Sequence, residues 1–339
     1  MNDNTINEET NVSNTEEPID NQETNEVPEE VKQEEEVKEL TDLHLQEIEN
    51  FREGFAKVYK RVKFLKYPIL IVSVAMMIVA FLVVPNVLTG EDQKTLQITL
   101  MVVLAVLALL IMLSDTFITK SIFNKKLVKY FDVYYGNLDD YLYVQDGVEI
   151  VEARPNDKLE ASQFTTGNAF GNVGQVISRG LVDLKLHDLN ILACDASGQV
   201  AKEKRYVPVF VGKYLISPAK YSGSDVLIYL KGDERALPPT NTESMKLQLD
   251  EKRVAVYSND SNWKKVFTTK FKTQLLKLKS NKTFVDLSIN VRDGSAYFYL
   301  GLDDEAMTVP LEKPLVEGPY KRTKEALSIV YKLIELLNE

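Results

Sequence analysis

Two stretches of this chain are apolar on all sides of a helix, and they divide it into parts with different patterns. Residues 67–88 and 95–114 contain no charged side chain, and apolar residues lie on every face. A bilayer core about 30 Å thick needs about 20 helical residues at 1.5 Å each. Both stretches reach that length, so residues 67–114 are predicted to form a two-span transmembrane hairpin whose loop runs from Pro85 to Lys94. Two buried helices of a large soluble core are the alternative.

The segments on either side of the hairpin are amphipathic. Residues 41–66 have apolar side chains at three- and four-residue spacing, which predicts a cytosolic helix that runs into the first span. Pro68 is then expected in the first turn of that span, where its missing N–H costs nothing. Residues 115–145 carry a similar stripe and predict a stalk helix. The two stripes could pack against each other or form the contact of a homo-oligomer. The stripe of the first segment comprises Leu45, Ile48, Phe51, Phe55, Val58 and Val62.

From residue 146 onward the pattern is mainly that of strands. Val182, Leu184 and Leu186 alternate with polar residues, as in a strand with one buried face. Residues 206–218, 225–233 and 245–258 predict further strands. Asp293-Gly294 lies between two alternating runs and predicts a hairpin turn.

Two helices are expected among these strands. Residues 262–280 predict one helix, and residues 320–337 predict a last helix after Pro319. Strands with a few interleaved helices indicate an α+β fold, here a mostly antiparallel cytosolic sheet domain over residues 146–339. The buried stripe of the first helix is expected to comprise Trp263, Phe267, Phe271, Leu275 and Leu278.

Charge is concentrated at the amino terminus. Residues 1–38 hold thirteen Asp or Glu and two Lys, a net charge of −11, while the whole chain is −10. The remaining residues therefore sum to +1. Residues 1–40 contain no aromatic side chain and few aliphatic ones, so they cannot bury enough apolar surface to fold and are predicted to be a disordered acidic tail.

Lysine and arginine are distributed unevenly around the two spans. Basic residues precede the first span, and Lys120, Lys125, Lys126 and Lys129 follow the second. The connecting loop has only Lys94, beside two acids. Because positively charged flanks stay in the cytoplasm, this asymmetry predicts a two-span cell-membrane protein with both termini cytoplasmic. A loop of about ten residues is too short for a receptor domain, so function is expected in the cytosolic part.

Candidates for chemistry are few. One cysteine, Cys194, excludes an internal disulfide, and His187 and His44 are the only histidines. The Gly-rich residues 166–180 lack the Gly-Lys-Ser/Thr of a phosphate loop, and a mobile loop is favoured there. Asp303, Asp304 and Glu305 could hold a hard cation, but a charged loop is favoured. We assign no catalytic residue, no cofactor and no metal site.

One basic segment could form a binding surface. Residues 245–282 hold ten Lys or Arg and three acids, a net charge of +7. Lys265, Lys272 and Lys279 lie opposite the apolar stripe of the predicted helix. They could be an ordinary solvated face, contact anionic lipid of the inner leaflet, or hold the chain's own acidic tail. Nucleic acid is disfavoured because the aromatic residues of this segment belong to the core and no recognition motif is present.

Three segments occur in an order that resembles a known family. They are "VPVFVGKYLIS", "VYSNDSNWKKVFTTKFKTQLLKLK" and "FVDLSINVRDGSAYFYLGLDD". Phe210 and Gly212 resemble its Phe-x-Gly strand, and residues 256–260 resemble its Val-Tyr-Ser-x-Asp turn. The family is the uncharacterised bacterial two-transmembrane family called domain of unknown function three-one-three-seven, and the resemblance covers about residues 60–335. The chain departs from it at Thr268-Thr269-Lys270, where the family tends to have Thr-Pro. The resemblance implies architecture and membrane location, but no reaction.

The sequence therefore predicts a membrane-anchored cytosolic binding or scaffold module whose ligand and protein partner are not identified. The alternative is an enzyme with a sparse Asp/Ser/Lys site in the cytosolic domain. A pocket with strongly perturbed carboxylates would favour the enzyme, and a flat surface with an exposed apolar patch would favour the scaffold. Transport is disfavoured because neither span contains an ionisable residue.

Overall fold

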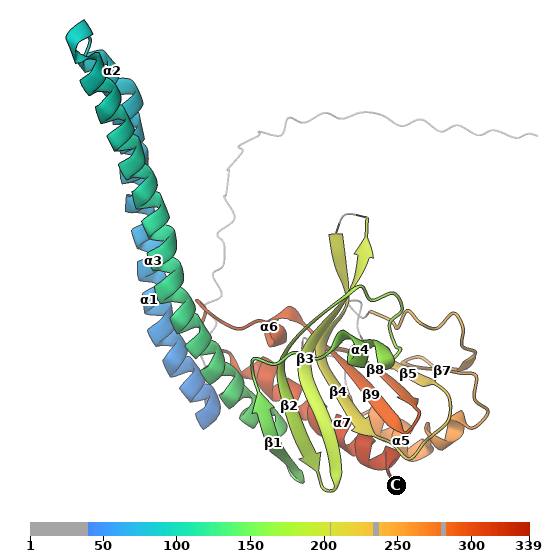
Figure 1. The fold of residues 1–339 in the computed structure, drawn as a ribbon. Helices are drawn as coiled ribbons and strands as arrows, with labels where there is room; N and C mark the ends of the chain where they lie inside the picture. Colours follow the sequence, from blue (N-terminus) through green and yellow to red (C-terminus); the bar gives the residue numbers. More distant parts are fainter. Residues whose placement is uncertain (1–39, 204, 233–236, 279–282) are drawn as a thin grey trace, which may run out of the picture. The chain divides into compact units, whose positions relative to one another are not determined.

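A long helical hairpin and a nine-stranded sheet make up the protein (Figure 1). The structure, a computed structural model, describes residues 40–203, 205–232, 237–278 and 283–339; the predicted acidic tail, except for Leu40, lies outside them. Helix α1 (Leu43–Ile78) continues through a π-turn (Val79–Val83) into α2 (Val84–Val87). A 3₁₀ turn, η2 (Glu91–Gln93), then leads into α3 (Lys94–Tyr143).

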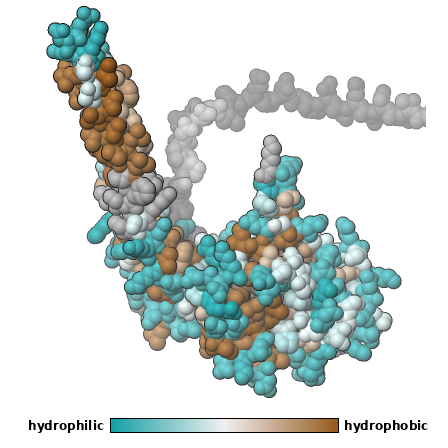
Figure 2. All heavy atoms as spheres, viewed as in Figure 1, coloured by the Kyte–Doolittle hydropathy of each residue, from teal (hydrophilic) through white to brown (hydrophobic). Residues whose placement is uncertain are grey.

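Both long helices are apolar over a length that could cross a membrane. The two apolar segments are Tyr67–Val87 and Glu91–Leu113, and only 17% and 6% of their most hydrophobic windows are buried within the chain. Figure 2 shows this part of the hairpin as a band of apolar surface below a hydrophilic tip. The amphipathic helices predicted over residues 41–66 and 115–145 belong to α1 and α3, with no break at the apolar segments.

The two prolines of the hairpin do not lie where the sequence placed them. Pro68 is inside α1 rather than in a first turn, because the preceding amphipathic helix continues through it. Pro85 lies in the first turn of α2, so the helical chain continues beyond it. The five-residue π-turn directly before α2 accommodates a position where the ordinary helical hydrogen bond is lost. The loop predicted from Pro85 to Lys94 is therefore mostly helical, and the stretch without helix is residues 88–90.

The sheet is antiparallel throughout, as predicted, with the strand order β1-β2-β3-β4-β9-β8-β5-β7-β6. Strands β3 and β4 form a long hairpin that extends past its neighbours (Figure 1). Asp293 and Gly294 join β8 to β9 with φ of 49° and 80°, the positive pair that a tight hairpin turn needs. The strands are β1 (Val148–Arg154), β2 (Gln175–Leu186), β3 (Leu189–Lys202), β4 (Arg205–Pro218), β5 (Val226–Leu230), β6 (Leu247–Asp250), β7 (Val254–Ser258), β8 (Phe284–Arg292) and β9 (Ser295–Leu302).

Each face of the sheet has its own apolar cluster. The face that we call the inner face packs on the end of α3, on α5 (Thr269–Leu275) and on α7 (Glu317–Leu337). The opposite face, the outer face, is covered in part by residues 159–173, which include α4 (Ala161–Thr166). The alternation predicted for β2 is confirmed, since Val182, Leu184 and Leu186 are buried against the inner-face helices.

The single helix predicted over residues 262–280 is wrong. A 3₁₀ turn, η3 (Trp263–Lys265), is followed by the separate helix α5. Thr268 causes the break: its backbone is extended, and its side chain accepts a hydrogen bond from the N–H of Phe271, which caps a new helix. The predicted apolar stripe is nonetheless part of the inner-face core.

The close pairing of β4 with β9 depends on glycine. Gly212 lies opposite Gly301, and a Cβ atom at position 212 would lie 1.9 Å from the carbonyl oxygen of Leu300. We expect Gly212→Ala to lower the free energy of unfolding by about 1–3 kcal/mol, the usual cost of overpacking. Thermal unfolding of the solubilised full chain measures this. Gly171→Ala is the control, because the nearest atom to its Cβ would be 3.8 Å away. Equal melting temperatures for the two variants would contradict the prediction.

Candidate functional site

Aromatic, hydrogen-bonded and charged contacts occur together at the junction between the helical hairpin and the sheet. The last turns of α3 enter the inner-face core, and Tyr130, Tyr134 and Tyr143 are at most 2% exposed. Tyr130 stacks on Phe55 of α1 at 5.3 Å between ring centroids, and its hydroxyl donates to the carbonyl oxygen of Pro310 at 2.5 Å. Aromatic packing thus joins α1, α3 and the segment before α7 in one core.

A second contact at this junction is polar. Glu49 accepts hydrogen bonds from Arg52, one turn on in α1, at 2.6 Å, and from the backbone N–H of Leu315 at 2.9 Å. Arg52 in turn donates to the carbonyl oxygen of Glu312 at 3.2 Å. Burial opposes ionisation of Glu49, but the bonds from Arg52 and Leu315 outweigh it and lower the pKa of the Glu49 carboxyl. These bonds fix the segment between α6 (Asp304–Met307) and α7 on α1.

Charged side chains are buried under the sheet where α3 ends. The ammonium of Lys213 on β4 lies 2.5 Å from a carboxylate oxygen of Asp195 on β3, and Lys213 is 3% exposed. Asp139 of α3 is 2% exposed. Burial lowers the pKa of Lys213, but Asp195, Tyr143 and Asp139 outweigh that effect, and the pKa stays well above its ordinary value. Lys213 is therefore a buried cation that links two strands to α3.

Asp139 is the less satisfied partner in this buried charge cluster. One of its carboxylate oxygens has no hydrogen-bond partner, and the hydroxyls of Tyr143 and Tyr331 have none either. Burial raises the pKa of Asp139 to about 7; Lys213 lowers it, and Asp195 and Asp140 raise it further. A carboxyl with this pKa exchanges its proton near neutral pH. Its exposure is too low for a substrate to touch it.

A shallow groove of about 610 Å³ lies on the outer face, over β1 to β4 and the β8–β9 turn. Leu192 and Ile216 are half-buried on its floor, and Val151, in the bulge of β1, is 63% exposed at its side. Figure 2 shows apolar surface over β2, β3 and β4 on this face. Asp183, Asn190 and Ser217 also line the groove. An open groove of mixed polarity is suited to binding a protein segment rather than to enclosing a small substrate.

The three lysines proposed for anionic surfaces do not lie on one helix. Lys265 is exposed on η3, whereas Lys272 is on α5. Lys272 forms an ion pair with Glu251 at 2.6 Å, so part of its charge is neutralised. Lys279 lies outside the described residues. Binding of these lysines to lipid or to the acidic tail stays a prediction.

The other chemical candidates have structural environments. Cys194 is 1% exposed, and burial raises the pKa of its thiol to about 12, so it carries almost no thiolate at neutral pH. His187 lies in the β2–β3 turn, with Nε2 3.1 Å from Glu335. Asp303 caps α6 by accepting from the N–H of Ala306 at 3.0 Å. Gly167 packs against the hydroxyl of Tyr299 and lets its segment lie close on the outer face. Among the described residues no group of three or more His, Cys, Asp and Glu side chains could hold a metal ion.

Known proteins give little guidance. No protein-family model matches the chain, and neither does any curated protein. Among solved structures, the crystal structure of the mycobacterial trehalose monomycolate transport factor A, TtfA, aligns with a TM-score of 0.31 and 10% identity, covering 60% of this chain and 96% of that chain. A TM-score this low does not establish a common fold. The resemblance to the uncharacterised two-transmembrane family stays a prediction.

The buried charge cluster was missed from the sequence. Lys213 occurs in "FVGKYLIS", where it takes an inward position two residues before the buried Leu215. A lysine at an inward position of a strand signals a buried partner, because an unpaired charge is costly to bury. The sequence did not show that Asp195 and Asp139, from another strand and from α3, would supply the negative charge.

The raised pKa of Asp139 predicts a pH dependence. Its pKa is about 7 in the folded chain, against an ordinary 3.8, so between these values the folded state binds more protons than the unfolded state. This group therefore stabilises the fold fully below pH 3.8, and its contribution is lost as pH rises from 3.8 through 7, on the order of 4 kcal/mol in all. We expect Asp139→Asn to lack this loss, so the variant gains stability relative to wild type between about pH 4 and pH 7.

Thermal unfolding of the full chain in neutral detergent, measured at several pH values, tests this. Asp140→Asn is the matched control, since Asp140 is the exposed neighbour on the same helix. Its curve should keep most of the wild-type loss of stability, slightly reduced because Asp140 helps to raise the pKa of Asp139. The same loss in Asp139→Asn would show that Asp139 does not titrate in this range.

Proposed function

We propose that this chain is a membrane-anchored binding module whose sheet domain lies in the cytosol. The observation that carries this is the continuity of α1 and α3. Each helix runs without interruption from an apolar, exposed segment into the core under the sheet. The two apolar segments would be transmembrane spans, and their exposed apolar side chains would face lipid.

The charge pattern supports the orientation. The basic residues flanking the spans lie on the parts of α1 and α3 that lead to the sheet, and the tip holds Glu91, Asp92 and Lys94. Positively charged flanks remain on the cytoplasmic side. Membership of the uncharacterised two-transmembrane family would fit this arrangement, but it would add no reaction.

Two observations favour binding over catalysis. The perturbed carboxyl, Asp139, is 2% exposed and so is closed to substrate. The groove on the outer face, by contrast, is accessible, open and partly apolar. A protein segment docked there would cover Val151 and contact Leu192 and Ile216. A homo-oligomer that uses the same groove is the other candidate, and cross-linking separates the two.

Labelling of single introduced cysteines can determine the membrane topology. In a Cys194→Ala background, we expect Gly90→Cys in the tip to react with a membrane-impermeant maleimide in intact cells. Position 90 tolerates a side chain, because its Cβ would lie 3.5 Å from Gln93. Lys202→Cys, exposed in the β3–β4 hairpin, should react only after the cells are permeabilised. Labelling of both positions in intact cells would refute the proposed orientation.

The groove can be tested with a photo-cross-linking residue in cells. At Val151 we expect one recurrent protein adduct, and a Leu192→Ser change in the groove floor should weaken it several-fold. The matched control is the same residue at Leu247 on β6, which is 53% exposed and lies outside the groove. Adducts with a second copy alone would assign the groove to self-association. Equal adducts at both positions would remove the groove as a specific surface.

A further inference from the structure

Along the outward face of α1, the exposed side chains change from basic to aromatic as the helix approaches the apolar segment. Lys57 lies three residues before Lys60 and four before Arg61, Phe64 lies four and three residues after these two, and Tyr67 lies three residues after Phe64, so all five share one side of the helix. The opposite side holds Phe55 and Tyr59, which pack on Phe123 of α3 at ring-centroid distances of 5.5 and 5.4 Å. One face of α1 thus carries three cations, then two aromatic rings, and then the apolar segment.

These five side chains are exposed and unused within the described chain. Lys57, Lys60 and Arg61 are exposed and form no ion pair among the described residues, whereas Lys63 lies 3.5 Å from Glu312. The rings of Phe64 and Tyr67 are 75% and 62% exposed. Aromatic rings exposed at the end of an apolar helix are typical of residues in the headgroup region of a bilayer.

The distances along the helix match a lipid surface. At 1.5 Å per residue, Arg61, Lys60 and Lys57 lie roughly 9, 10 and 15 Å from Tyr67. The headgroup layer is about 5–7 Å thick on each side, and charges interact over about 8–10 Å beyond it at physiological salt. Long basic side chains extend toward the interface and shorten the distance further. The guanidinium of Arg61 can also bind a phosphate with two parallel hydrogen bonds.

We propose that Lys57, Lys60 and Arg61, with Phe64 and Tyr67, form a binding site for anionic phospholipid headgroups of the cytoplasmic leaflet. The proposal rests on the membrane anchoring proposed above and goes beyond it by naming a ligand class and a face. The site differs from Lys265 and Lys272, which belong to the sheet domain. The phosphate of phosphatidylglycerol, or the phosphate and carboxylate of phosphatidylserine, would bind the cations, and the acyl chains would lie beside the two rings.

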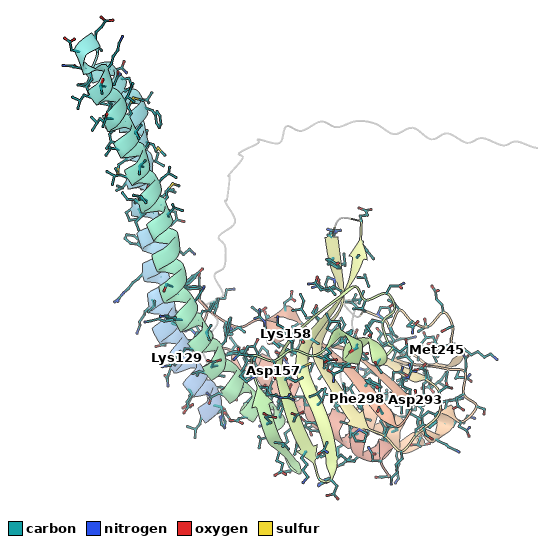
Figure 3. The ribbon with its side chains drawn as sticks, in the orientation of Figure 1. Lys129, Asp157, Lys158, Met245, Asp293 and Phe298 are labelled. Carbon is teal, nitrogen blue, oxygen red and sulfur yellow. The ribbon has the colours of Figure 1, made fainter. Side chains whose placement is uncertain are left out.

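The chain offers a matched set of distant cations. Lys125, Lys126 and Lys129 on α3 are also exposed and form no ion pair among the described residues. They lie roughly 18, 20 and 24 Å from Leu113, beyond the headgroup layer and about twice the screening length. Figure 3 places Lys129 on the part of α3 that adjoins the sheet domain. If only the number of cations mattered, the two sets would contribute equally to lipid binding. If distance from the membrane matters, only the set on α1 contributes strongly.

The experiment titrates the full chain in neutral detergent with short-chain phosphatidylglycerol, with phosphatidylcholine as the neutral control and glycerol phosphate as the free headgroup. We expect wild type to prefer phosphatidylglycerol. Lys57→Gln/Lys60→Gln/Arg61→Gln should weaken its binding by about fivefold per cation, on the order of a hundredfold in all. Lys125→Gln/Lys126→Gln/Lys129→Gln should change it less than about twofold, because of screening. Phe64→Ala should weaken binding of phosphatidylglycerol but leave binding of glycerol phosphate unchanged.

Each other outcome overturns the proposal. Equal losses in the two triple variants would mean general charge attraction. Binding of glycerol phosphate as tight as that of the lipid would assign the cations to a soluble anion. Resistance of the chain to extraction from membranes by alkaline carbonate is measured separately. Extraction would refute the anchoring itself, whereas a retained chain without lipid preference would refute only the headgroup site.

Discussion

The packing of α3 beneath the sheet is the contact on which the rest of the structure depends. This helix has 50 residues, and its two halves lie in different surroundings. The amino-terminal half leaves its apolar side chains exposed, while the carboxy-terminal half contributes Tyr130, Tyr134 and Tyr143 to the inner-face core. Without that packing, the hairpin and the sheet would be two bodies joined by a linker. With it, one continuous helix joins the apolar segment to the sheet, where the ring of Tyr143 lies 5.1 Å from the ammonium of Lys213 on β4.

The buried charges at this contact are better explained by how they position α3 against the sheet than by a contribution to the stability of the fold. Replacing a buried ion pair with apolar side chains of similar volume is often neutral or stabilising, because desolvation offsets the attraction. An apolar interface, however, tolerates small slides of a helix along its axis. A slide of α3 would separate Asp139 from Lys213, and a slide of α1 would break the hydrogen bond from Leu315 to Glu49. The polar contacts therefore define how the hairpin enters the sheet domain, at the cost of leaving one Asp139 oxygen unpaired.

The sequence predicted features that depend on local pattern and missed those that depend on the fold. Uniform apolarity identified the two long segments, and period-two alternation identified β2, β8 and β9. Asp293-Gly294 identified the turn that joins β8 to β9. The insertion of β5 between β8 and β7 involves strands distant in sequence, so no local pattern reports it. The cluster of Lys213 with Asp195 and Asp139 draws on three elements for the same reason. The break at Thr268 was readable, since a Thr before Thr-Lys-Phe is a good helix cap, but the longer apolar stripe concealed it.

Continuous helices also determine where such a domain can act. Phe55 is the last buried residue that α1 contributes to the inner-face core, and it lies twelve residues before Tyr67, or roughly 18 Å along the helix. A flexible linker of twelve residues would let the domain sample all separations up to its full length, whereas a helix holds a single one. Lipid contacts on the face of α1 would then fix the depth of the helix, and the shared core would carry that constraint to the sheet. Under the anchoring proposed above, a partner of the outer-face groove would itself lie close to the membrane, because a domain held in this way cannot leave it.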